Sequence, residues 1–175
     1  MKKAAIIGLM TAFTLVAATP AAAQALRNDT SYDKEFGVKY SILNEEGTWA
    51  NVGLLLDGGV KVCEVGTWSC SIIGELAFNR FSDFDATYTT YQAGVRLGKV
   101  VDSKMRPYVQ FLLGGQACCG GENAFVITPG AGLNYAMTEA VDFQVQVDLP
   151  QARYFGDWFS QFRLSFGVGI PFGNR

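Results

Sequence analysis

The chain has 175 residues, with 14 basic and 16 acidic side chains, 20 glycines, 13% aromatic residues and no histidine. This length fits one domain, and the net charge of −2 disfavours nucleic acid as a partner. Because histidine is the usual general base of serine and cysteine hydrolases, its absence from the sequence predicts a protein that is not an enzyme.

The first 23 residues have the pattern of a secretory signal peptide. Lys2 and Lys3 precede an uncharged run at 4–18, and small residues follow up to Ala23. The run is shorter than the roughly 20 apolar residues of a spanning helix. We therefore expect residues 1–23 to be removed and residues 24–175 to form a single domain, with the basic count lowered from 14 to 12 by the loss of the two lysines.

From residue 35 onward, large apolar side chains alternate with small or polar ones. Strict alternation is the pattern of strands with two different faces. It recurs eight times and predicts an all-β fold, an eight-stranded antiparallel up-and-down β-barrel, with strands at 35–43, 49–57, 71–81, 87–98, 106–115, 125–135, 141–149 and 161–172. Pro129 lacks an N–H donor, so we expect a bulge or a weak pair in the sixth strand.

The connections between these strands differ in their expected length. If the first strand starts in the periplasm, the outer loops are 44–48, 82–86, 116–124 and 150–158. The periplasmic turns are then 58–70, 99–104 and 136–140, of which the first is unusually long.

Seven charged residues of the strands lie on the faces that carry glycine and glutamine, and the opposite faces carry almost none; the seven are Lys39, Asp57, Glu75, Arg96, Asp142, Asp148 and Arg163. Two barrels fit this separation. A soluble periplasmic barrel of the lipocalin kind turns the apolar faces inward and binds an apolar ligand, whereas a transmembrane barrel turns them toward lipid. Small residues share the charged face, as a crowded interior requires, and the other face is rich in aromatic residues. These two features favour the transmembrane barrel.

The last predicted strand, residues 161–172, reads Gln-Phe-Arg-Leu-Ser-Phe-Gly-Val-Gly-Ile-Pro-Phe. It resembles the closing strand of the small, porin-like outer-membrane β-barrel family that includes OmpA-type and OmpX-type proteins. The resemblance implies a monomer in the outer membrane of a Gram-negative cell envelope, inserted by the barrel-assembly machinery. It also implies a structural or surface-interaction role, with the outer loops open to a surface partner.

The interior of an eight-stranded barrel is only wide enough for side chains. Inward acids and bases must therefore pair, because an unpaired buried charge is costly. We predict a lumen network of Lys39, Glu75, Arg96, Asp148 and Arg163 that excludes a wide diffusion pore. Inward glycines leave open a narrow water path, and a histidine-free lipid-modifying enzyme remains an alternative to the structural role.

The four cysteines form two sequence pairs. Their spacing is not that of a zinc site, so no metal or cofactor is expected. Disulfides are the default in an oxidising envelope, and Cys63 and Cys70 share one turn, which predicts a Cys63–Cys70 bond. Cys118 and Cys119 are adjacent, with Cα atoms about 3.8 Å apart. Disulfides prefer about 4.4–6.8 Å, so this second pairing is left open.

Overall fold

The computed structural model describes residues 33–173, apart from 46, 51, 82–85 and 119–121. The predicted signal peptide at 1–23 lies outside the described residues. The described part of the chain contains no helix that is long and apolar enough to cross a membrane.

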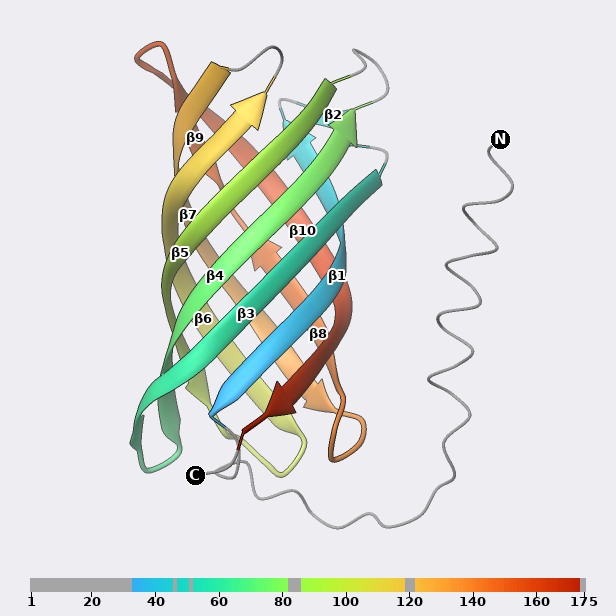
Figure 1. Cartoon of the computed structure of the whole chain (residues 1–175), viewed down its shortest axis with the longest axis vertical. Helices are drawn as coiled ribbons and strands as arrows, with labels where there is room; N and C mark the ends of the chain where they lie inside the picture. The colour runs from blue at the N-terminus through green and yellow to red at the C-terminus, as the bar shows by residue number, and fades with distance from the viewer. Residues whose placement is uncertain (1–32, 46, 51, 82–85, 119–121, 174–175) are drawn as a thin grey trace, which may run out of the picture.

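Ten strand segments form one closed antiparallel barrel (Figure 1). They are β1 (Lys34–Glu45), β2 (Thr48–Trp49), β3 (Val52–Val65), β4 (Trp68–Phe81), β5 (Ala86–Lys99), β6 (Met105–Cys118), β7 (Glu122–Ala136), β8 (Asp142–Asp148), β9 (Gln151–Tyr154) and β10 (Asp157–Phe172). Because β2 leads into β3, and β8 into β9, the wall has eight strands. The predicted all-β, eight-stranded up-and-down fold is confirmed.

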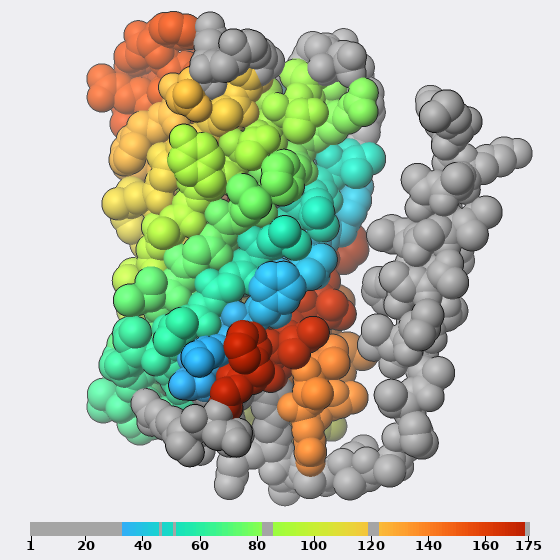
Figure 2. Space-filling model, in the orientation of Figure 1, coloured from blue at the N-terminus to red at the C-terminus, as the bar shows by residue number. Residues whose placement is uncertain are grey.

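The barrel closes where the first strand meets the last. β1 pairs with β10 along an unbroken ladder from Lys34–Phe172 to Glu45–Gln161. In the space-filling view, the blue side chains of β1 lie directly against the red side chains of β10 (Figure 2). No described edge of this sheet is left unpaired by the closure, as a barrel in lipid requires.

Two wall strands are interrupted near the upper end of the barrel as drawn in Figure 1. Between β2 and β3 the register with β1 shifts by one residue, and the Ala50 N–H donates to the Leu43 carbonyl across the gap. Between β8 and β9 the register with β7 is kept. This second gap contains Pro150, whose missing N–H explains the break.

Pro129 produces no bulge, so that part of the prediction is wrong. β7 pairs with β6 in one register throughout, including Pro129 opposite Phe111. The weak pair does occur, on the other side of β7, where the gap between β8 and β9 lies opposite Pro129 and the Leu149 N–H still donates to the Pro129 carbonyl at 2.9 Å.

Three predicted connections are too long. The 58–70 turn is replaced by the extended β3 and β4, which leave only Gly66 and Thr67 between them. Likewise β6 and β7 take up most of 116–124, and β9 and β10 take up most of 150–158, with a turn at Phe155–Gly156. The first error has a clear cause, because a register shift between Lys61 and Cys63 breaks the alternation there.

The barrel wall carries apolar side chains on its outside and polar or charged ones on its inside, the reverse of a soluble protein. Exposed apolar side chains cover the outside along every tilted strand, among them Phe36, Val38, Leu54, Ile72, Val95, Val109, Phe111, Phe166 and Ile170. The buried set is largely polar or charged and includes Lys39, Asp57, Glu75, Gln92, Arg96, Gln110, Gln146, Asp148 and Arg163. An apolar exterior around a charged interior is the arrangement of a barrel that sits in lipid.

Candidate functional site: the filled lumen

The centre of the lumen holds one arginine between two carboxylates. Arg163 of β10 places Nη2 2.6 Å from Glu75 Oε2 and 2.7 Å from Asp148 Oδ2. Two glutamines bridge the same carboxylates: Gln146 Nε2 lies 2.8 Å from each, and Gln110 Nε2 lies 2.9 Å from Glu75 and 3.1 Å from Asp148. These side chains come from β4, β6, β8 and β10, so the group joins β4 and β6 to β8 and β10, with which neither β4 nor β6 pairs in the sheet.

A second group of charges lies beside the first. Lys39 Nζ is 3.0 Å from Asp57 Oδ1 and donates to Gln146 Oε1 at 2.7 Å. Arg96 pairs with Asp57 at 3.1 Å and with Glu35 at 2.5 Å, and its guanidinium lies 4.2 Å from the centre of the Tyr108 ring. Because Gln146 also binds the central carboxylates, the two groups form one continuous network across the lumen.

The structure thus brings together all five predicted network residues, Lys39, Glu75, Arg96, Asp148 and Arg163. Sequence reasoning left Glu35 and Asp57 out of that set. Both residues lie on the face that carries Lys39 or Glu75, so the alternation was a sufficient signal for them. Asp142 pairs with Arg106 near the lower end of the barrel.

Toward the upper end, apolar side chains enter the lumen. One buried cluster contains Leu43, Ala50 and Phe81, and another contains Ala124, Val126 and Ala152. Between them, Gln116 and Gln161 bond to each other and to Thr90, Glu45 and Tyr154. The lumen is therefore closed twice, by charged pairs in its centre and by a mixed layer above them.

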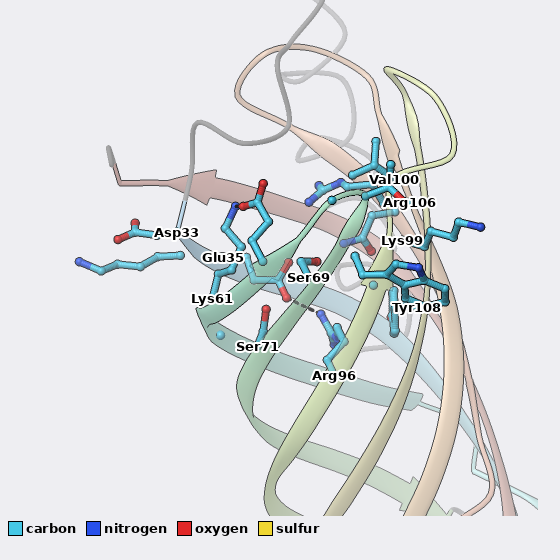
Figure 3. A pocket seen from close by; sticks show the side chains of 18 of the residues that line it. Asp33, Glu35, Lys61, Ser69, Ser71, Arg96, Lys99, Val100, Arg106 and Tyr108 are labelled. Atoms are coloured by element: carbon cyan, nitrogen blue, oxygen red, sulfur yellow. Dashed lines mark hydrogen bonds and ion pairs between the residues drawn. The ribbon is translucent and has the colours of Figure 1, made fainter.

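At the lower end, the lumen widens into a cavity of about 430 Å³, which we call the vestibule (Figure 3). Its lining includes Lys61, Glu64, Ser69, Ser71, Asn134 and Arg106. Arg96 and its partner Glu35 also line it and lie between the vestibule and the group of Arg163, Glu75 and Asp148. The charged side chains of its wall are five cations and three carboxylates: Lys34, Lys61, Arg96, Lys99 and Arg106 against Asp33, Glu35 and Glu64. Among them, Lys61 pairs with Glu64 at 2.8 Å.

Inward glycines make room for the network rather than for a channel. A β-carbon at Gly130 would collide with the Asp148 carboxylate, and one at Gly132 with the Tyr108 ring. The same relation holds between Gly169 and Gln144. The space opened by these glycines is filled by long side chains of neighbouring strands.

The described cysteines lie at opposite ends of the barrel. Cys63 and Cys70 are cross-strand neighbours on β3 and β4, joined by a disulfide with Cα atoms 5.1 Å apart. Cys118 ends β6, and Cys119 lies outside the described residues. Within the described ranges, no group of three or more His, Cys, Asp or Glu side chains is arranged to hold a metal ion.

Comparison with known proteins finds the fold but no sequence family. No family model and no curated protein matches the chain. Among solved structures, Neisserial surface protein A is similar over 81% of this chain and 97% of its own, with a TM-score of 0.60 and 14% identity. The attachment invasion locus protein Ail of Yersinia pestis, in complex with the heparin analogue sucrose octasulfate, is similar over 81% of this chain and 98% of its own. Its TM-score is 0.53 and its sequence identity is 15%.

A third similar structure is that of an enzyme. The outer-membrane enzyme PagL matches over 78% of this chain and 99% of its own, with a TM-score of 0.53 and 12% identity. The shared property of the three is therefore the barrel and not one activity. In its fold, with an apolar outer face and a charged, filled interior, the chain is similar to these small outer-membrane β-barrels.

Proposed function

We propose that this barrel has a structural or surface-interaction role in the outer membrane and is not a diffusion pore. β1 begins on the periplasmic side, so the vestibule opens to the periplasm and the β9–β10 hairpin lies at the cell surface. The observation that carries the proposal is the bridge of Arg163, Glu75 and Asp148, which spans the lumen with contacts of 2.6 and 2.7 Å.

Planar-bilayer recording of the purified monomer tests the closed lumen. We expect silence or rare, small current steps from the wild type. Glu75→Ala or Arg96→Ala frees a counter-charge and should raise the open probability, although the mixed layer around Leu43 and Phe81 still limits the current. Large, stable steps from the wild type would place the protein among the diffusion porins.

Two other functions compete with this proposal. A soluble, ligand-carrying barrel needs an apolar interior, and here the apolar residues line the outside. A lipid-modifying enzyme is compatible with the fold, which is shared by PagL, so fold alone does not decide. The proposal of a non-enzymatic role is supported by the sequence, which has no histidine to serve as a general base.

The surface-interaction part of the proposal rests on the tip of the β9–β10 hairpin. Phe155 is 88% exposed there and has a φ of +49°, a conformation that is strained for a bulky aromatic residue. Trp158 is half-exposed nearby, with Arg153 5.8 Å from its ring. Below them, the exposed Ser160 donates a hydrogen bond to the partly buried Gln151. The exposed rings at the tip are the surface that a partner would contact.

An epitope tag tests this orientation. Inserted between Phe155 and Gly156, in an exposed turn, the tag should be detected by antibody on intact cells. The control carries the same tag after Ser103, in the exposed turn at the opposite end, and should be detected only after permeabilisation. Detection on intact cells of the tag after Ser103, and not of the tag at Phe155, would contradict both the assigned orientation and the surface role.

A further inference from the structure

The charges inside the lumen do not balance. Of the seven that form the central network, four are carboxylates, from Glu35, Asp57, Glu75 and Asp148, and three are cations, from Lys39, Arg96 and Arg163. Arg106 and Asp142 form a separate, neutral pair. With every group ionised, these seven would carry one net negative charge; six of them are buried, and Glu35 is partly exposed at the vestibule. An uncompensated charge away from water is costly.

The excess charge can be assigned to one place. Lys39 and Arg96 have Asp57 and Glu35 as their partners, two cations against two carboxylates. Among the described residues, Glu75 and Asp148 share Arg163 as their ion-pairing partner. Because three nitrogens, Arg163 Nη2, Gln110 Nε2 and Gln146 Nε2, each donate to both carboxyls, the two groups are held close together.

We propose that Glu75 and Asp148 hold one proton between them in the folded barrel at neutral pH, which makes the lumen network electrically neutral. Two carboxyls that share one site resist losing both protons. The proton fits best on Asp148 Oδ1, which accepts a single hydrogen bond, from Gln110 at 3.1 Å, while Oδ2 accepts from Gln146 and Arg163. Asp148 Oδ1 itself occupies the space beside Gly130 that a side chain there would take.

The groups that face the pair come from all sides of the barrel. Lys39 on β1, Asp57 on β3 and Arg96 on β5 act electrostatically on Glu75, and Tyr108 of β6 donates to Gln146. On β7, the described inward residues from Val126 to Asn134 are uncharged. We therefore expect that removing any one of the seven charges changes the occupancy of the proton site.

Infrared spectroscopy of the refolded barrel tests this directly, because the carbonyl stretch of a protonated carboxyl is separate from that of a carboxylate. We expect a protonated-carboxyl band at pH 7 that disappears in Asp148→Asn and in Glu75→Gln. Asp57→Asn leaves the remaining network neutral without the proton, so it should also remove or weaken the band. Glu64→Gln, in the rim pair with Lys61, is the control and should leave the band unchanged. A wild-type spectrum without the band overturns the proposal.

Stability gives a second readout. Free Asp and Glu side chains titrate near pH 4, so at neutral pH the unfolded chain has lost the proton that the folded barrel keeps. The unfolding equilibrium constant should then rise about tenfold per pH unit, as long as the folded state retains the proton. Asp148→Asn should remove this slope and Glu64→Gln should keep it; a slope unchanged in Asp148→Asn contradicts the assignment. The proposal rests on the filled lumen of the proposed function, but neither readout depends on conductance, so the two can fail separately.

Discussion

The guanidinium of Arg163 reaches across the lumen to the carboxylate of Glu75, with 2.6 Å between Nη2 and Oε2, although β10 pairs with β1, β8 and β9 and β4 pairs with β3 and β5. The sheet alone does not hold these two residues together. Their contact is a tertiary tie between opposite parts of the wall, and it makes the interior contribute to the stability of the barrel.

Arg163→Ala should therefore destabilise the folded barrel strongly. It leaves Glu75 and Asp148 without their cation, and loss of one partner of a buried pair costs roughly 3–5 kcal/mol. Urea unfolding of the refolded protein in lipid vesicles measures the change. Lys104→Ala, in an exposed turn, is the matched control and should stay within about 0.5 kcal/mol of wild type. Equal midpoints for the two variants would show that the network adds nothing to stability.

Gly132→Ala should also destabilise the barrel, because the new methyl group collides with the Tyr108 ring and with the Val145 carbonyl. Overpacking of this kind costs about 1–3 kcal/mol. Gly58→Ala tests the same exchange on another strand, where the nearest atom to the new carbon is the Glu35 carbonyl oxygen at 3.7 Å, an ordinary contact. There we expect no loss and a gain of up to about 1 kcal/mol. Thermal or urea unfolding distinguishes the two.

The lipid-facing surface can be probed at one cross-strand pair. Val145 of β8 and Phe166 of β10 lie directly opposite each other, and Phe166 is exposed on the outside. Val145→Arg or Phe166→Arg should cost about 2–4 kcal/mol in a bilayer, where arginine at mid-depth is poorly solvated. Val101→Arg, in the exposed turn at the lower end, should cost about 1 kcal/mol or less. No difference between the positions would contradict the assigned lipid face.

The Cys63–Cys70 disulfide closes a short hairpin loop, and peptide mapping without reductant should recover this linkage. Replacing both residues by serine should lower the stability of the folded state by about 2.5 kcal/mol, the chain-entropy value for a loop of this size. Comparison of wild type and variant under reducing conditions is the control, because both then lack the bond and should unfold alike. Recovery of Cys63 linked to Cys118 or Cys119 would contradict the strand topology as well.

Most of the fold could be predicted from alternation, because a strand with lipid on one side and a crowded lumen on the other needs opposite residue types at successive positions. The prediction failed where alternation stops. The extra residue at Lys61–Cys63 puts the end of β3 out of phase, and so 58–70 was read as a turn. Likewise, inward Leu43 and Phe81 do not differ in type from outward residues, so the mixed upper layer of the lumen had no signal in the sequence.

The candidate site could also be predicted only in part. The sign and the face of each charged lumen residue could be read from the sequence, but its partner could not. Pairing depends on the tilt and stagger of the strands, which bring Arg96 to Glu35 and Asp57, and Arg106 to Asp142. No local pattern specifies contacts between residues 61 positions apart, such as Glu35 and Arg96.

The ladder between β1 and β10 constrains how the chain can assemble. Lys34 at the start of β1 is the cross-strand partner of Phe172 at the end of β10, and Glu45 is the partner of Gln161. These ladder pairs can form only after β10 is present. The entire chain must therefore be present before either terminal strand can satisfy its backbone groups on both sides, and such distant pairing makes closure slow. A truncated chain without β10 would carry open strand edges into lipid, so pairing of β1 with β10 is the step that removes those edges.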